Sequence, residues 1–306
     1  MRSFFLIAFV FLSVVTTKAC DICGCGVGGN YIGILPDFNK KIAGLRYRYN
    51  NLQTHVAPGG TTTYLTTREI FHTADIWGGW NIRKNFRIMI TVPYNFTEKT
   101  NQAVTRNKSG LGDISLAGFY QLLNKKTMIS KDRLLIQSLW LGGGIKLPSG
   151  KYNPVDKSNS NQNANLFQLG TGSTDLNLYA MYDIRLQDIG FNINSSYKIN
   201  TANKYDYCYG NKFSLSTQLY HKFRIGNKSN IAPNAGLFFE SAQKDMDGKI
   251  SVDASGGNML AGGIGTEFSY KKIMLGFNWQ TPISQHLASG IVKARNKLML
   301  HTAFAF

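Results

Sequence analysis

The sequence predicts an all-β protein, a transmembrane antiparallel β-barrel of about 12 strands with both termini in the periplasm. Three observations predict this fold: a secretory signal at the N-terminus, a regularly alternating C-terminal strand that ends on Phe306, and connections that alternate between short and long. The 306-residue chain is rich in Gly (31), Phe (19) and Tyr (15) but has only 7 Pro. After the signal, no apolar run approaches the ~20 residues that a membrane helix needs, so only strands can carry this chain across a membrane.

Residues 1–19 have the pattern of a secretory signal peptide. Arg2 supplies the basic start, residues 3–17 form a short, mostly apolar centre, and the small Ala19 marks the expected cleavage site. A lipoprotein acylated on Cys20 is the alternative, although the residues before it suit that signal poorly. The sequence therefore predicts three segments in an outer-membrane protein of a Gram-negative bacterium: 1–19 signal peptide, 20–39 cysteine-rich periplasmic segment and 40–306 barrel.

Twelve segments alternate apolar and polar side chains with the period of a β-strand. The connection between two of them, 149–171, is 23 residues long, whereas 186–188 has three, and long and short connections alternate almost throughout. Outer-membrane barrels have short periplasmic turns and long extracellular loops, which explains the alternation if the strand number is even. The expected strands are 41–52, 67–82, 86–97, 110–123, 133–148, 172–185, 189–201, 212–225, 230–243, 258–269, 273–283 and 292–306.

The closing strand shows the two faces most clearly. Leu298, Leu300, Thr302, Phe304 and Phe306 share one face, and Lys297, Met299, His301, Ala303 and Ala305 share the other. The first set suits lipid and the second suits a lumen, and the terminal aromatic residues are expected to be recognised by the barrel-assembly machinery. A soluble β-sandwich could also end this way, but it gives no reason for the alternating connections. Segment 67–82 is less regular, because Arg68, Glu69, His72 and Asp75 fall on both faces, and part of it is expected to rise above the membrane.

Charge is the next constraint. The formal net charge is +17, or +15 without Arg2 and Lys18. Nucleic acid is excluded as a partner, because the basic residues are scattered and the chain is exported. Basic loop residues such as Lys99, Arg106 and Lys108 suit anionic lipid head groups. The charged residues predicted on the lumen face form a candidate path for small solutes, including anionic ones. In one interpretation they attract anions into the lumen. In the alternative they pair with one another and close it. These residues are Arg46, Arg48, Arg87, Asp113, Lys146, Asp175, Lys198, Lys212, Lys222, Arg224, Glu240 and Glu267, together with Asp183.

The longest connection, 149–171, is rich in Asn and Lys and has almost nothing with which to build a core. Loops of this composition are most often solvated, and the alternative is that this one folds inward as a constriction.

Three thiols lie close to the expected mature N-terminus, at Cys20, Cys23 and Cys25. They could converge on a soft metal ion such as copper or zinc, although a closed tetrahedral site would need a fourth ligand. A disulfide between two of them, or Cys20 as a lipid anchor, are the alternatives. Cys208 is expected on the opposite side of the membrane and should not pair with them.

Three motifs occur in order along the chain: Gly110-Leu111-Gly112-Asp113-Ile114-Ser115-Leu116, Gly144-Ile145-Lys146-Leu147-Pro148-Ser149-Gly150, and Leu169-Gly170-Thr171-Gly172-Ser173-Thr174-Asp175. Together they resemble the outer-membrane transporter family labelled after the meta-pathway of phenol degradation, over roughly residues 40 to 306. The resemblance implies a barrel that passes small molecules, and the cysteine-rich segment departs from it.

The expected function is passive transport of small solutes through an outer-membrane barrel, with metal capture by the cysteines as an addition. The first alternative is a barrel that anchors a periplasmic metal or redox module. A membrane-lipid hydrolase is the third. It is disfavoured because Ser284 and His286 have no recognisable orienting acid and no other histidine shows the expected arrangement, so no catalytic residue is predicted.

Overall fold

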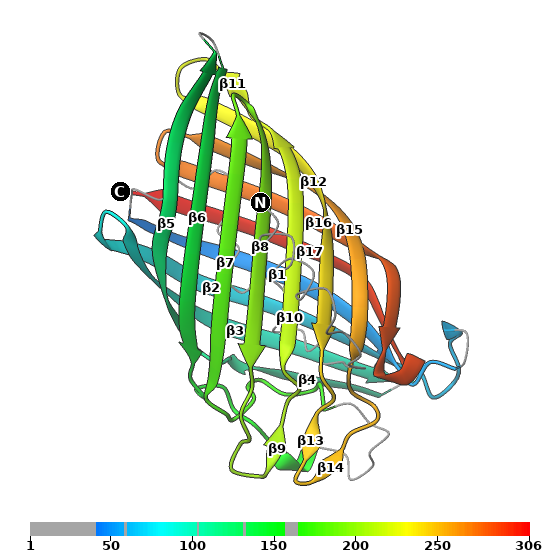
Figure 1. The fold of residues 1–306 in the computed structure, drawn as a ribbon. Coiled ribbons are helices and arrows are strands. Elements are labelled where there is room, and N and C mark those ends of the chain that lie inside the picture. The colour runs from blue at the N-terminus through cyan, green and yellow to red at the C-terminus, as the bar shows by residue number, and fades with distance from the viewer. Residues whose placement is uncertain (1–40, 58–59, 103, 131–132, 157–164) are drawn as a thin grey trace, which may run out of the picture.

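The computed structural model describes residues 41–57, 60–102, 104–130, 133–156 and 165–306, which form a closed antiparallel β-barrel (Figure 1). Within these residues, twelve strands make the wall, as the sequence predicts. They are β1 (Ile42–Thr54), β2 (Thr67–Arg83), β3 (Phe86–Asn101), β5 (Ser115–Ser130), β6 (Arg133–Lys146), β7 (Asp175–Leu186), β8 (Ile189–Ile199), β10 (Lys212–His221), β12 (Ser229–Ala242), β15 (Gly257–Tyr270), β16 (Ile273–Leu287) and β17 (Val292–Ala305).

The barrel closes because the first and last strands pair. β1 and β17 are antiparallel, with Ile42 opposite Ala305 and Arg46 opposite His301. Every other wall strand pairs with its neighbours along the chain. Two of the predicted segments are each divided in two. Residues 110–123 contain a break between β4 (Val104–Leu111), which extends the hairpin with β3, and β5; residues 212–225 break between β10 and β11 (Phe223–Ile225).

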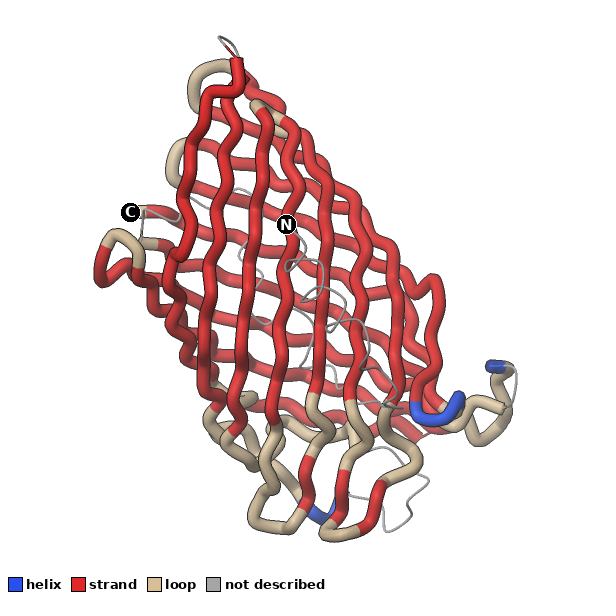
Figure 2. The backbone as a smooth tube through the Cα atoms, in the orientation of Figure 1, coloured by secondary structure: helices blue, strands red, loops and turns tan. Residues whose placement is uncertain are grey.

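Short turns lie at one end of the barrel and longer connections at the other (Figure 2). The longer connections carry a small sheet of β9 (Tyr207–Cys208), β13 (Met246–Asp247) and β14 (Ile250–Ser251), and the short helical turns η2 (Pro154–Asp156) and η3 (Ala288–Gly290). Phe306 N donates to Lys41 O at 2.9 Å, so the described chain begins and ends at the short-turn end. We call the opposite end the loop end.

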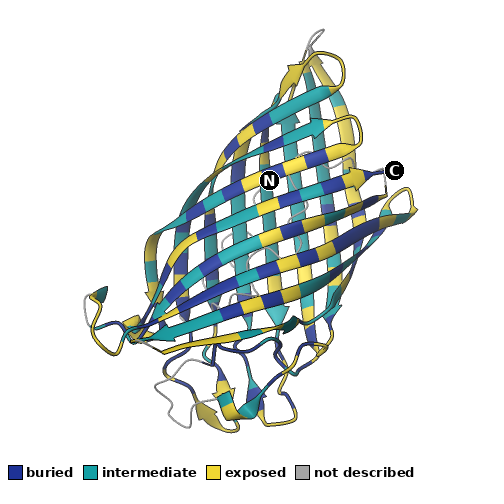
Figure 3. Ribbon diagram, turned by 180° about the vertical axis from the view of Figure 1, so that it is seen from behind, coloured by how far each residue is buried: buried dark blue, intermediate teal, exposed yellow. Residues whose placement is uncertain are grey.

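The outer face of the wall is apolar. Buried and exposed residues alternate along the strands (Figure 3), and Leu45, Ile76, Leu300 and Phe304 are 58, 64, 44 and 47% exposed. A continuous apolar surface of this kind needs lipid around it, and the barrel therefore lies in the outer membrane. In the described part of the chain, no helix has the length and apolar character required to cross a bilayer.

β2 is more regular than its sequence suggests. Glu69 and Asp75 are each 1% exposed and face the interior, whereas Arg68 is exposed and His72 is half-buried on the outer face. The charged residues of β2 thus sort cleanly, with both carboxylates inside. The alternation is irregular in the sequence because the outer face of β2 is also polar near the loop end, where Arg68 and His72 lie.

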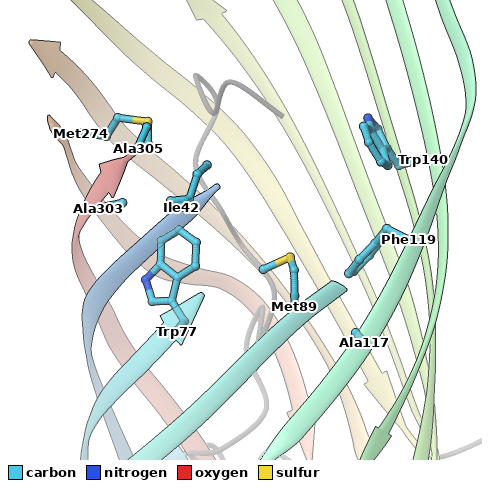
Figure 4. Close-up of a cluster of buried hydrophobic side chains, with 9 residues drawn as sticks. All are labelled: Ile42, Trp77, Met89, Ala117, Phe119, Trp140, Met274, Ala303 and Ala305. Carbon is cyan, nitrogen blue, oxygen red and sulfur yellow. The ribbon is translucent and has the colours of Figure 1, made fainter. Parts of the chain in front are cut away.

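Apolar side chains fill the interior near the short-turn end (Figure 4). Trp77 of β2 lies beside Ile42 of β1, while Phe119 and Trp140 project from β5 and β6. The cluster consists of Ile42, Trp77, Met89, Ala117, Phe119, Trp140, Met274, Ala303 and Ala305. This part of the lumen is therefore narrowed by packed apolar groups, as in other small barrels whose own side chains occupy the interior.

Two adjacent glycines of β6 provide a matched test of this packing. A Cβ on Gly142 would lie 2.5 Å from Phe119 Cδ1 and 3.0 Å from Gly118 O, whereas a Cβ on Gly143 would have no heavy atom within 4 Å. We expect Gly142→Ala to lower the free energy of unfolding by about 1–3 kcal/mol, because the ring of Phe119 must move. Gly143→Ala should change it by less than about 0.5 kcal/mol. Urea unfolding in lipid vesicles measures both, and equal effects would contradict the packing argument.

Candidate functional site

Among the residues that the structure describes, three clusters of ion pairs in the barrel interior include residues predicted on the lumen face. The first joins β1 and β2. Arg46 Nε lies 2.7 Å from Asp75 Oδ2, and Arg48 Nη2 lies 2.9 Å from Asp75 Oδ1. Asp75 has no exposed side-chain surface, so its carboxylate depends on these two guanidinium groups. Two guanidinium groups thus share the carboxylate of Asp75.

The second cluster is centred on Lys146 of β6. Its Nζ lies 2.6 Å from Asp113 Oδ2 and 2.7 Å from Asp175 Oδ2, and it also contacts the Thr171 hydroxyl. Lys198 of β8 adds a longer contact of 3.4 Å to Asp175. Two cations and two carboxylates balance in this cluster. Because Asp113 precedes β5 and Thr171 precedes β7, Lys146 also links two connections to the wall.

The third cluster surrounds Glu240 of β12. Lys212 Nζ of β10 lies 3.3 Å from Glu240 Oε2, and Lys297 Nζ of β17 lies 3.0 Å from Glu240 Oε1. The side chains of all three are at most 7% exposed. Two strands, β15 and β16, separate β12 from β17, so Lys297 reaches over them inside the barrel. The cluster again holds two cations for one carboxylate.

The remaining predicted residues are placed as follows. Arg87 is 1% exposed inside the barrel, and His301 Nε2 lies 3.6 Å from Glu267 Oε2. Lys222 is half-buried where β10 ends. The prediction that Arg224 faces the lumen is wrong, because β11 lies at the short-turn end of the wall. The Arg224 side chain is 68% exposed there, and its Nη2 lies 2.9 Å from Asp188 Oδ1.

The longest connection folds into the barrel mouth, so the expectation of a plainly solvated loop is wrong for its described part. Asn165, Leu166, Phe167 and Gln168 are all less than 9% exposed. Leu166 packs in a cluster with Leu52, Phe71, Met259, Leu287, Ala288, Val292 and Ala294. These residues belong mainly to β1, β2 and β15 to β17, which lie opposite β6 and β7 in the strand order. Residues 165–168, which we call the inward segment, therefore cross the mouth.

Polar contacts hold the inward segment in place. Lys108 Nζ donates to Phe167 O at 2.6 Å and pairs with Asp156 at 2.5 Å, and Asn95 Nδ2 donates to Leu169 O at 2.9 Å. Lys108 and Lys99 each pair with a carboxylate of this chain, since Lys99 Nζ lies 3.1 Å from Glu69 Oε1. Their suitability for lipid head groups stays a prediction. Arg106 is exposed.

Lys297 and Thr171 are the site residues that the predicted set lacks. The alternation of the closing strand places Lys297 inside, but no local signal shows that it would reach Glu240. Thr171 lies in a connection, where alternation gives no information.

The predicted metal ligands Cys20, Cys23 and Cys25 lie outside the described residues, so copper or zinc binding there stays a prediction. Within the described ranges, no three His, Cys, Asp or Glu side chains are grouped closely enough to hold a metal ion. Cys208 is half-buried in β9 at the loop end, and its burial raises the pKa of its thiol.

The sequence matches one family model, and solved structures share the fold. A family model described as "Putative MetA-pathway of phenol degradation" matches residues 46–285. An outer membrane channel from Pseudomonas putida F1 has a similar fold, with a TM-score of 0.61 and 12% identity over 90% of this chain and 100% of the channel. The β domain of the Bordetella autotransporter BrkA has a TM-score of 0.53 and 9% identity over 87% of this chain and 100% of that domain. No curated protein matches.

Proposed function

This chain belongs to the family described as the MetA-pathway of phenol degradation, and from that premise we propose that it is an outer-membrane channel for the passive passage of small solutes. The observation that carries the proposal is the contrast between the two faces of the wall. The outside is apolar, while the inside holds buried ion pairs that a lipid-facing or plugged apolar barrel would not need. The similar fold of an outer membrane channel supports it.

We place the short-turn end in the periplasm, because outer-membrane barrels keep short turns there. This orientation puts Phe304 and Phe306 on the side of the barrel-assembly machinery. It also puts Lys41, which follows the cysteine-rich segment, in the periplasm.

Small anionic solutes are the proposed cargo. The clusters around Asp75 and Glu240 each hold two cations for one carboxylate. The cluster around Lys146 holds two cations and two carboxylates. Within these three clusters of described residues, six cations therefore face four carboxylates, so the cations are in excess there. An interior with residual positive charge favours anions over cations.

The test is planar-bilayer conductance with salt gradients that measure anion and cation permeability. We expect a small conductance with anion preference, because the inward segment narrows the mouth. Cation selectivity would contradict the proposed cargo, and the absence of any conductance would contradict the channel. The same preparation in liposomes should show no lipid hydrolysis, and lipid turnover without solute flux would favour an enzyme.

Glu240→Gln tests the charge argument within the lumen. The substitution removes the carboxylate between Lys212 and Lys297 and leaves two cations in one cluster. We expect the anion-to-cation permeability ratio to rise, because the lumen gains one net positive charge. Asp253→Asn is the control, since Asp253 pairs with Lys244 at the loop end and its side chain is 71% exposed. A ratio that falls, or that moves equally in both variants, would contradict the prediction.

A further inference from the structure

The outer face of the barrel changes from apolar to polar at one level on three adjacent strands. Moving toward the loop end, the outward residues of β1 change from Leu45, Tyr47 and Tyr49 to Asn51 and Gln53. On β2 they run from Ile76 and Ala74 through the half-buried His72 and the buried Ile70 to the exposed Arg68. On β17 they change from Leu300 and Leu298 to Asn296 and Arg295. This is the level at which lipid acyl chains give way to head groups.

A depression of about 400 Å³ lies at this level, lined by Tyr49, Asn51, Gln53, Arg68, Arg295 and Asn296. Both arginines are exposed, and Arg295 Nε donates to Gln53 Oε1 at 2.9 Å, which holds its guanidinium beside β1. Among the residues that the structure describes, neither arginine forms an ion pair with a carboxylate. The depression thus combines two guanidinium groups with amide donors and contains no acidic residue.

An apolar hollow of about 730 Å³ lies next to this depression on the same wall, on the side of the short-turn end. Outward side chains that line it include Leu45, Tyr47, Ile76, Leu275, Phe277 and Leu300. Tyr47 and Tyr49 follow each other on the outer face of β1 and connect the two regions. His72 lies between them, with Nδ1 2.6 Å from Tyr47 Oη and its ring centroid 5.4 Å from that of Tyr49.

We propose that this surface is a binding site for a phosphorylated glycolipid of the outer leaflet. The phosphate lies between Arg68 and Arg295, whose planar guanidinium groups suit bidentate contacts with phosphate oxygens. The amides of Asn51 and Asn296 donate to the sugar or phosphate oxygens, and the acyl chains cover the apolar hollow. The choice of the outer leaflet rests on the proposed orientation, in which the loop end is extracellular.

The test uses the full-length barrel, delipidated in detergent, and native mass spectrometry. The probes are a bisphosphorylated acylated diglucosamine, its dephosphorylated form and an anionic glycerophospholipid. We expect retained binding of the phosphorylated lipid by the wild-type protein and much weaker binding of the dephosphorylated one. The double variant Arg68→Gln/Arg295→Gln should bind the phosphorylated lipid about 25-fold more weakly, at about fivefold for each arginine near a lipid surface. Arg83→Gln/Arg133→Gln removes two exposed arginines at the short-turn end and should leave binding unchanged.

Three results would overturn the proposal. These are equal binding of both lipid forms, equal weakening in both double variants, or preference for an anionic glycerophospholipid over the glycolipid. Conductance separates this site from the proposed channel. The Arg68→Gln/Arg295→Gln variant should keep wild-type conductance, because both arginines face away from the lumen, so loss of lipid binding with normal conductance leaves the channel intact.

Discussion

Lys146→Met is expected to lower the free energy of unfolding by about 3–5 kcal/mol, the usual cost of removing one partner from a buried ion pair. Lys146 Nζ lies within 2.7 Å of both Asp113 and Asp175, and Asp175 has no exposed side-chain surface. Methionine fills a similar volume but leaves both carboxylates without their nearest cation. Lys198 is a poor substitute, because its Nζ lies 3.4 Å from Asp175, farther than the 2.7 Å of Lys146 Nζ.

Urea unfolding of the barrel in lipid vesicles, followed by tryptophan fluorescence, measures this loss. Lys244→Met is the matched control: it removes the same type of cation from an ion pair with Asp253 that is exposed at the loop end. We expect it to cost less than about 1 kcal/mol. If Lys146→Met were as mild as the control, water in the lumen would be solvating Asp113 and Asp175, and the cluster would not be a structural link.

Replacing the inward segment with Gly-Ser-Gly-Ser is expected to raise single-channel conductance several-fold. Leu166 anchors this segment among Leu52, Phe71 and Met259 on the far wall, and Phe167 is held by Lys108. The replacement removes the apolar anchor and two large side chains from the mouth. A flexible polar segment of the same length has no reason to remain across it.

The control makes the same replacement at residues 61–64, which are exposed in the connection between β1 and β2. Its conductance should match that of the unaltered protein. Unchanged conductance in the inward-segment variant, with the barrel folded, would move the narrowest point to the apolar cluster around Trp77 and Trp140 near the short-turn end. Substituting Trp140 would then be the next experiment.

The Lys146 cluster and the inward segment are connected through Thr171. Thr171 follows the inward segment along the chain, its backbone N–H donates to Asp113 Oδ2 at 2.8 Å, and its hydroxyl contacts Lys146. Lys146 therefore fixes the base of the connection, while Leu166 fixes its tip. Loss of Lys146 should also loosen the mouth, and the conductance of Lys146→Met is expected to fluctuate more than that of the wild-type protein.

Local alternation in the sequence is enough to predict the wall of this barrel. A strand has a period of two residues, so the alternation in segments such as 189–201 and 292–306 predicts both the strand and the face on which each residue lies. The even number of strands, the closing strand and the inward position of Arg46, Lys146, Asp175 and Glu240 all follow from this local pattern. These predictions needed no knowledge of which strands touch.

The arrangement of the interior depends on contacts between distant segments and could not be predicted from the sequence. Whether Lys297 meets Glu240 depends on the curvature that brings β17 and β12 together across two strands, and alternation along one strand contains no such information. The inward segment is a similar case: its polar surroundings suggest a solvated loop, and Leu166 finds its partners on strands more than 90 residues away. A strand repeats every two residues, so it produces a two-residue pattern in the sequence that can be recognised locally. Contacts between distant segments depend on how the whole barrel closes, and no local pattern contains them.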